Sequence, residues 1–339
     1  MKAKKVEKHK DKIIGLIVSL IFIGLIVWRL DWNMLADTIK MFNYKVLFAF
    51  VPLYVLSIYI RGARWKYLLC LNEKLSVKEA FLSFTAGNTL NSYLPARAGD
   101  FWRAYHVGNK ISESKMKLFG SIILERIIDG ISVLLILFFA VITYFNHPDV
   151  LKVGYISAFL FIGALVFFFI VVKTGKIDVI FQKLKTFPVL NRFESAMDKM
   201  SLHMQSFMSG FEVMNNPRCF AFAFLMSITA WTLECVVTYI LILGFGQYFG
   251  FSISFFVISF IALSTIIPSS SVFVGPYQFA YILALGIYHV NKSQALGIAF
   301  IHQLTIMLVI TVIAIIYFMS SNSSLKDIKA GLTKEDKNE

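Results

Sequence analysis

Apolar runs of membrane-spanning length recur along almost the whole sequence, and they restrict the fold more than any other feature. A helix that crosses a bilayer needs about 20 apolar residues, with a range of about 17–25. Runs near that length are 13–28, 46–60, 118–144, 153–172, 219–243 and 295–319. Hydrophobic residues make up 58% of the 339 residues and charged residues only 16%. This composition leaves too little polar surface for a soluble domain, and it is also unlike that of a disordered chain or a disulfide-linked scaffold. We therefore predict an all-α polytopic membrane protein.

Two further apolar stretches are interrupted by residues that break helices. Residues 79–106 start at a capping box formed by Ser76–Glu79. The apolar segment that follows contains Asn88 and Asn91 and stops at Pro95. Residues 251–290 are interrupted by a Pro-Ser-Ser-Ser run and by a Gly-Pro pair. Non-helical backbone is tolerated at membrane depth only where protein or a watery cavity satisfies its polar groups. We therefore predict that both stretches are re-entrant, broken-helix units.

The basic residues indicate the topology. Lys and Arg number 33 against 20 Asp and Glu, a formal charge of +13, and they gather between the apolar runs. The positive-inside rule places every basic segment in the cytoplasm if the broken units enter from opposite faces. This topology predicts six full spans plus two re-entrant units in the cell membrane, with both termini cytoplasmic, although hydropathy alone allows six to eight spans. It also places the segment 61–78 in the cytoplasm. Opposed broken segments in the two halves are typical of an inverted-repeat transporter.

The same pattern predicts the domain organisation. Residues 1–12 form a basic cytoplasmic tail, residues 13–320 a single transmembrane domain, and residues 321–339 a second cytoplasmic tail. Within the domain, residues 173–218 contain Met and Phe at roughly helical spacing with charges between them. We expect an amphipathic cytoplasmic helix that lies on the membrane or packs on the bundle. The three cysteines have no metal-ligand spacing and are interpreted as packing residues.

The first group of candidate substrate-binding residues follows Pro95. Arg97, Asp100 and Arg103 share a stripe if a helix begins there, and guanidinium groups suit the phosphate of a lipid headgroup. The alternative is that these arginines only extend to the cytoplasmic interface.

A second group of candidates lies within a long apolar helix and comprises Glu125, Arg126 and Asp129. Each charge at the centre of a span costs about 2.5–3.5 kcal/mol by insertion scales, so these groups need partners. Pairing with the two arginines of the first group would give one buried ionic network. That network either binds substrate or only holds the broken helix in place.

The remaining candidates are polar groups in or near the apolar segments. Hydroxyls and amides near the second break suit an anion or a headgroup, whereas a lone histidine on an apolar helix is more often a packing residue. These secondary candidates are Asn88, Asn91, Glu234, Ser269, Ser270, Ser271, Gln278 and His302. We find no nucleophile with a base, no P-loop, no dinucleotide loop and no zinc spacing. We therefore expect no catalytic residue, no metal, no cofactor and no nucleic-acid partner.

The two charged motifs resemble a known family. Asn91-x-x-Leu94-Pro95-x-Arg97-x-Gly99-Asp100-x-x-Arg103, followed by Glu125-Arg126-x-x-Asp129, is similar to the lysylphosphatidylglycerol synthase transmembrane, or flippase-like, family. That family includes the membrane part of the multiple peptide resistance factor. The chain departs from the family at Ser269–Ser271 and Gln278, where glycines and an acidic residue are usual.

The resemblance implies a protein that moves an anionic or aminoacylated phospholipid, or a polyprenyl-phosphate-linked substrate, between leaflets. The chain ends about 20 residues after its last apolar run, so we expect it to lack the transferase domain of full-length relatives. A separate lipid-modifying enzyme is then the expected partner. Two alternatives stay open, namely an intramembrane enzyme or accessory subunit of aminoacyl-phospholipid or glycolipid synthesis, and a small-solute transporter.

Overall fold

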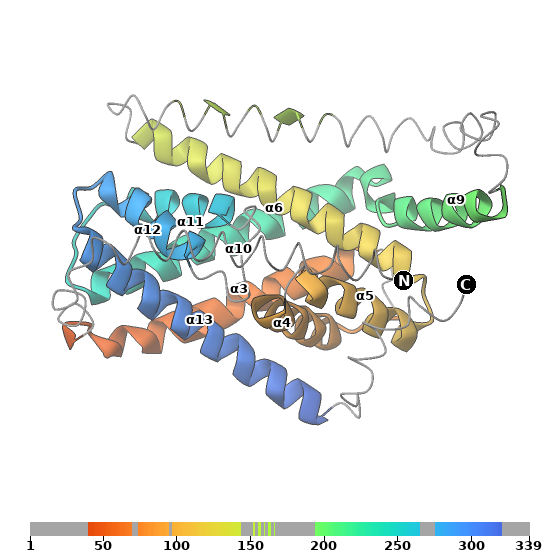
Figure 1. The fold of residues 1–339 in the computed structure, drawn as a ribbon, viewed down its shortest axis with the longest axis horizontal. Helices are drawn as coiled ribbons and strands as arrows, with labels where there is room; N and C mark the ends of the chain where they lie inside the picture. Colours follow the sequence, from red (N-terminus) through yellow and green to blue (C-terminus); the bar gives the residue numbers. More distant parts are fainter. Residues whose placement is uncertain are drawn as a thin grey trace, which may run out of the picture.

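A computed structural model describes residues 40–69, 74–94, 97–143, 194–264 and 275–320, with single positions between 152 and 166. Every regular element in these ranges is a helix (Figure 1). The prediction of an all-α polytopic membrane protein is therefore confirmed. The predicted first span, most of the run 153–172, Ser269–Ser271 and both tails lie outside the described residues.

The helices follow one another with short connections in the N-terminal part. The 3-10 helix η1 (Tyr44–Val46) leads into α3 (Leu47–Leu68), which is followed by α4 (Val77–Tyr93), α5 (Ala98–Ile111) and α6 (Lys115–Thr143). The later elements are α9 (Glu194–Ser209), η4 (Glu212–Asn215), α10 (Pro217–Gly244), α11 (Ser252–Ser264), α12 (Pro276–Gly286) and α13 (Lys292–Ser320). Among the described residues, three segments are long and apolar enough to cross a membrane: Tyr44–Leu68, Pro217–Gly244 and Lys292–Met319.

The first predicted interruption separates α4 from α5. Ser76 begins α4 by accepting a hydrogen bond from the Glu79 backbone N–H at 3.1 Å, as the capping box predicts. After Tyr93 the backbone becomes extended, and Arg97 then adopts a left-handed conformation with φ 53° immediately before α5. Gly99 at the start of α5 lies so close to Gly87 of α4 that a Cβ atom would overlap the Gly87 carbonyl. The second break lies between α11 and α12, so both broken units are helix pairs.

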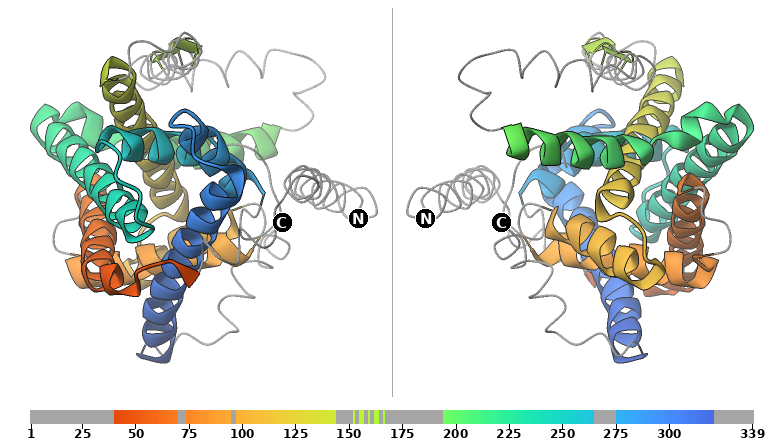
Figure 2. Two further views of the ribbon diagram at one scale, coloured as in Figure 1. Left: turned by 90° about the vertical axis from the view of Figure 1, so that its left-hand side faces the viewer. Right: turned by 90° about the vertical axis from the view of Figure 1, so that its right-hand side faces the viewer.

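Helix contacts repeat between the two halves. In each half a long helix (α3 or α10) contacts the first member of a broken pair, the pair members contact each other, and the second member contacts another long helix (α6 or α13). The contacts between the two halves, called cross-contacts below, match as well: α4 packs on α13, and α11 packs on α6. The two leading helices, α3 and α10, pack against each other, whereas α6 and α13 lie on opposite sides of the bundle (Figures 1 and 2).

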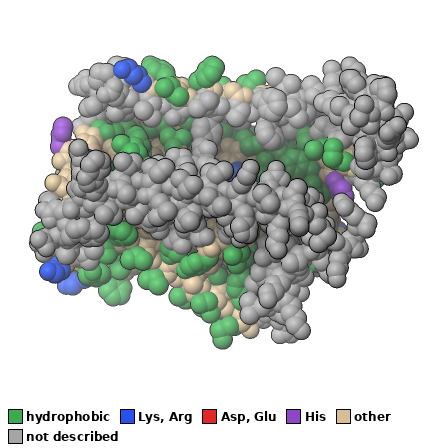
Figure 3. Space-filling view, viewed as in Figure 1, with side chains coloured by type: hydrophobic (Ala, Val, Ile, Leu, Met, Phe, Trp, Pro, Cys, Tyr) green, Lys and Arg blue, Asp and Glu red, His purple; other side chains and the backbone are tan. Residues whose placement is uncertain are grey.

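Apolar side chains fill the bundle and also cover its outer faces. The largest core cluster includes Phe50 of α3, Leu241 of α10, Phe256 of α11 and Tyr281 of α12. The described side chains visible in Figure 3 are mainly hydrophobic. On α13 the exposed residues include Leu304, Leu308, Val312, Ile315 and Ile316. A helix face of this composition is suited to lipid rather than water.

Part of the predicted amphipathic segment 173–218 is described from residue 194 onward. Helix α9 begins there and packs along one end of α6 (Figure 1). Gly120 of α6 lies against the Phe207 carbonyl, and Gly210 lies against the backbone near Ser121. These two glycines allow the chain after α9 to approach α6 closely, so this part of the segment packs on the bundle.

One element differs from its predicted extent. The apolar run 46–60 was expected to end at the membrane surface, with Arg61 and Arg64 in a cytoplasmic stretch. Instead α3 continues to Leu68, and the Arg64 side chain is fully buried. The helix continues because acidic side chains of α6 and α10 provide partners for both arginines inside the bundle.

Candidate functional site

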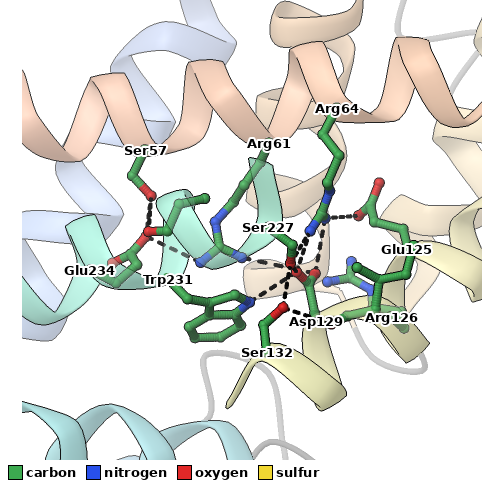
Figure 4. Close-up of polar contacts among 12 residues, drawn as sticks. Ser57, Arg61, Arg64, Glu125, Arg126, Asp129, Ser132, Ser227, Trp231 and Glu234 are labelled. Carbon is green, nitrogen blue, oxygen red and sulfur yellow. Dashed lines mark hydrogen bonds and ion pairs between the residues drawn. The ribbon is translucent and has the colours of Figure 1, made fainter. Parts of the chain in front are cut away.

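Asp129 of α6 is the centre of a buried charged cluster (Figure 4). Arg64 donates through Nη1 to Asp129 Oδ1 at 2.5 Å and through Nη2 to Asp129 Oδ2 at 3.1 Å. From α10, Ser227 Oγ and Trp231 Nε1 donate to the same carboxylate at 3.0 and 2.9 Å. A bidentate guanidinium pair with further donors is the arrangement that best offsets the cost of burying two charges. Three helices, α3, α6 and α10, are thereby joined at one carboxylate.

A second ion pair in the cluster links Glu125 to α5. Arg103 Nη2 donates to Glu125 Oε2 at 3.2 Å, and Arg64 lies 3.9 Å from the other oxygen of that carboxylate. The Arg103 guanidinium also stacks over the Trp65 and Phe84 rings at 4.4 and 5.1 Å. Arg103 and Glu125 are almost completely buried, which favours a structural role for this pair.

The third pair fixes the start of α5. Arg126 Nη2 donates to both oxygens of Asp100, at 3.0 and 3.4 Å. Asn91 of α4 donates through Nδ2 to Asp100 and accepts from the Asp100 backbone N–H. The Arg126 side chain remains 30% exposed, and Arg97 is exposed at the same end of the cluster. The first break of the chain is thus attached to α6 through Asp100.

Arg61 and Glu234 form the remaining part of the cluster. Arg61 lies 3.9 Å from Asp129 Oδ2 and 3.6 Å from Glu234 Oε1, with its guanidinium 4.2 Å above the Trp231 ring. Glu234 also accepts a hydrogen bond from Ser57 Oγ at 2.9 Å. Figure 4 shows Arg61 between the two carboxylates, with Ser57 and Arg64 on the same helix.

A cavity of about 440 Å³ opens beside this cluster. Its polar wall includes Arg61, Arg97, Arg126, Asp129, Glu234, Asn88, Asn91 and Ser92. Its aliphatic lining comes mainly from α11 and α13 through Ile258, Ile261, Ala262, Leu263, Ile306 and Ile310, and apolar side chains of α3, α4, α6 and α10 line it as well. The cavity therefore offers charged hydrogen-bond donors and acceptors together with apolar side chains.

Residues near the second break form a separate polar group. The Gln278 side chain accepts from the Gly275 backbone N–H at 2.7 Å and donates to Gln303 at 2.6 Å, which fixes the start of α12 against α13. His302 Nδ1 contacts the hydroxyls of Tyr277 and Tyr281, and His302 lines the cavity. Gln278 is not among the cavity-lining residues, so its contacts indicate a structural role.

The structure brings most of the candidate residues into one cluster. Arg103, Glu125 and Asp129 are linked through Arg64, and Asn91, Asp100 and Arg126 form a second linked group beside them, while Arg97, Asn88, Glu234 and His302 line the adjoining cavity. The expected pairing of both motif arginines with the α6 acids is correct for Arg103 with Glu125. The partner of Asp129 is Arg64 instead, since Arg64 enters from α3.

Five residues of the cluster are not among the sequence-based candidates: Ser57, Arg61, Arg64, Ser227 and Trp231. A signal for the two arginines was present, because three acidic residues in apolar helices require cations of similar depth. Their spacing of three residues places both arginines on one face of α3, directed at α6 and α10. No comparable signal marked Trp231.

Comparison with known proteins supports the structural description. Residues 12–314 match the family described as the lysylphosphatidylglycerol synthase TM region. A curated relative, a UPF0104 membrane protein of Methanocaldococcus jannaschii, is 25% identical over 248 residues, which is 71% of this chain and 97% of the relative. Because the family match covers most of the sequence, the protein belongs to the lysylphosphatidylglycerol synthase transmembrane family.

Proposed function

We propose that the protein moves a phospholipid or lipid-linked substrate between the leaflets of the cell membrane. The observation that supports this proposal is the mixed lining of the cavity, which combines charged groups from α3, α6 and α10 with aliphatic side chains, most of them from α11 and α13. A lipid likewise combines a polar headgroup with apolar chains. A site for a small ion or sugar would not need so many aliphatic side chains.

The charges favour an anionic or phosphate-bearing headgroup. The cluster contains five arginines (Arg61, Arg64, Arg97, Arg103 and Arg126) and four carboxylates (Asp100, Glu125, Asp129 and Glu234), a difference of one positive charge. Arg97 and Arg126 retain exposure and line the cavity. An aminoacylated phospholipid or a polyprenyl phosphate would satisfy the same guanidinium groups, and a separate lipid-modifying enzyme would supply or use it.

A liposome assay tests this function. Purified protein is reconstituted with a fluorescent phosphatidylglycerol in the inner and outer leaflets, and a membrane-impermeant reductant then quenches the accessible label. We expect quenching to exceed the half that protein-free vesicles show, and Arg126→Gln to slow the additional phase about tenfold or more. Arg218→Gln is the matched control, because Arg218 is exposed at the start of α10, away from the cavity.

Two results would contradict the proposal. The first is wild-type quenching that equals that of protein-free vesicles at several lipid compositions. The second is chemical conversion of the labelled lipid, detected by mass spectrometry of the extracted vesicles, which would favour the enzymatic alternative. Unchanged lipid of altered sidedness would support translocation.

A further inference from the structure

Arg61 and Arg64 lie one turn apart on α3 but differ in their exposure and in the number of hydrogen bonds they make. Arg64 is 0% exposed and makes three hydrogen bonds, two to Asp129 and one to Ser227 at 2.6 Å. Arg61 is 11% exposed, and its nearest carboxylate oxygens are 3.6 and 3.9 Å away. Both distances exceed the range of a hydrogen bond. Arg64 is therefore bound firmly by the protein, whereas, among the described residues, Arg61 is held only by charge and by the Trp231 ring.

The hydrogen-bonding capacity of Arg61 is accordingly available to a ligand. A guanidinium carries five N–H donors, and buried donors normally have partners. In the part of the chain that the structure describes, the Nε atoms of Arg61, Arg64 and Arg126 are all buried without a hydrogen bond, but of these three only Arg61 also makes none through its Nη atoms. The residue lines the cavity, where the other lining groups leave room for a ligand to accept from it.

Movement of Arg61 would leave both neighbouring carboxylates with partners. Asp129 would keep its hydrogen bonds from Arg64, Ser227 and Trp231. Glu234 would keep its hydrogen bond from Ser57. Loss of Arg64 from its position, by contrast, would remove the bidentate partner of a buried carboxylate. Of these two arginines, Arg61 can therefore turn toward a ligand without removing a hydrogen bond from either carboxylate.

We infer that Arg61 binds the phosphate group of the substrate, turning from its position between Asp129 and Glu234 to donate two hydrogen bonds to phosphate oxygens in the cavity. This inference rests on the proposed function and assigns its headgroup contact. The planar guanidinium matches two oxygens of a phosphate, whereas a lysine ammonium at this position would act as a point charge. The phosphate can belong to a lipid headgroup or be free inorganic phosphate.

Binding to the purified full chain in detergent tests the inference. Isothermal titration compares a short-chain phosphatidylglycerol with inorganic phosphate on the wild type, Arg61→Gln, Arg61→Lys and Arg218→Gln. We expect Arg61→Gln to weaken phosphatidylglycerol binding roughly 10- to 100-fold, Arg61→Lys to have an intermediate effect, and Arg218→Gln to have none. Weak or undetectable binding of inorganic phosphate identifies the lipid headgroup as the source, whereas equal binding of both probes identifies the phosphate group alone.

A fluorescence measurement provides a second readout of binding beside Arg61, because Trp231 lines the same cavity. Because Arg61 lies over the Trp231 ring, its movement should alter tryptophan emission on phosphatidylglycerol binding, and Trp231→Phe should remove that change. Arg61→Lys retains the positive charge and keeps the test valid if Arg61→Gln does not fold. Wild-type affinity in either folded Arg61 variant would overturn the inference.

The two proposals fail in different ways. Arg61-dependent binding without any translocation by the wild type would leave the phosphate site in place and remove the translocase function. Wild-type translocation and affinity in Arg61→Gln, together with slow translocation in Arg126→Gln, would overturn the Arg61 assignment alone.

Discussion

Arg64 and Asp129 form the residue pair on which the stability of the bundle depends most directly. Both are buried, and Asp129 receives hydrogen bonds from two other helices. We expect Arg64→Gln to lower the free energy of unfolding by about 3–5 kcal/mol, because it leaves a buried carboxylate without its bidentate partner. Unfolding in detergent, followed by circular dichroism, measures the loss. Arg61→Gln should have a smaller effect, since Arg61 makes no hydrogen bond within the described residues; equal losses would contradict this distinction.

A surface pair provides a pH-dependent prediction at the same scale. The hydrogen bond from Lys74 lowers the pKa of Glu113 below its usual range, with an Nζ–Oε1 distance of 2.6 Å. A carboxylate with a lowered folded-state pKa contributes stability above its unfolded pKa and loses it as the pH falls through the folded value. Because both groups are partly exposed, a double-mutant cycle of Lys74→Ala and Glu113→Ala should give only about 0.2–1 kcal/mol of coupling at pH 7.

The double-mutant cycle of Lys74 and Glu113 is repeated at successively lower pH. The coupling should decline as the pH falls through the lowered pKa of Glu113, where this carboxylate becomes protonated, and high salt should reduce the coupling at pH 7. A coupling that persists at pH 2 would contradict the ionic explanation.

Individual residues also show what the sequence could predict about the site. The motif residues Asp100, Arg103 and Glu125 could be placed together because uncompensated charges in apolar segments need each other. The same rule did not locate Arg61 and Arg64, since basic residues at the end of an apolar run are equally typical of a cytoplasmic boundary. Only the tertiary packing of α3 against α10 shows that these arginines face acids rather than water.

At the scale of helices, the position of α5 depends on one close backbone contact. A Cβ atom on Gly99 would overlap the Gly87 carbonyl and lie 2.8 Å from the Asn91 backbone nitrogen. We expect Gly99→Ala to displace α5 and to cost about 1–3 kcal/mol of stability, with weaker lipid binding because Asp100 moves as well. Gly286→Ala is the matched control, since nothing lies within 4 Å of a Cβ atom there and the residue is helical.

Thermal unfolding and phosphatidylglycerol titration of the two glycine variants provide the measurements. The control should change stability by no more than about 1 kcal/mol, in the stabilising direction if alanine's helix propensity dominates. Similar behaviour of both variants would show that α5 tolerates movement away from α4.

The extents of the helices could be predicted where local chemistry determines them. Ser76 begins α4 through a side-chain cap, and both breaks follow from Pro and Gly in apolar segments. The end of α3 at Leu68 could not be predicted in this way, because nothing local distinguishes its buried arginines from exposed ones. Likewise, the spacing of Met and Phe predicted an amphipathic α9, but its contact with α6 depends on Gly120 and Gly210, which lie 90 residues apart.

Across the whole molecule, the two halves share helix contacts but differ in chemistry. Each packing contact among α3, α4, α5 and α6 has its counterpart among α10, α11, α12 and α13. The charged residues come mostly from the first half, whereas the second half supplies Glu234, hydroxyls and most of the aliphatic wall of the cavity. The two corresponding breaks could be predicted from the sequence. The matched helix contacts could not, because they depend on tertiary packing. The cavity is therefore lined by two halves of similar packing and unlike polarity.

Under the proposed translocase function, this arrangement predicts that the contacts between α4 and α13 and between α6 and α11 must open during each transport cycle. The α4–α13 contact includes the hydrogen bond between Tyr93 and Thr311 at 3.1 Å, and the α6–α11 contact includes the apolar cluster of Ile136 and Ile258. Cysteines introduced at Tyr93 and Thr311, in a chain without its native cysteines, can be joined by a short thiol-specific linker. We expect the linked protein to bind phosphatidylglycerol normally but to translocate it at least about tenfold more slowly.

The matched variant joins positions 136 and 258 in the same background, and the repeat predicts the same loss of translocation there. Each single-cysteine protein treated with the linker controls for chemical modification, and a cleavable linker should restore activity after reduction. Full translocation by either linked protein would show that its cross-contact stays closed during transport. A loss at one contact only would show that the two contacts, although alike in their packing, are not equivalent during transport, and that only the sensitive contact has to open.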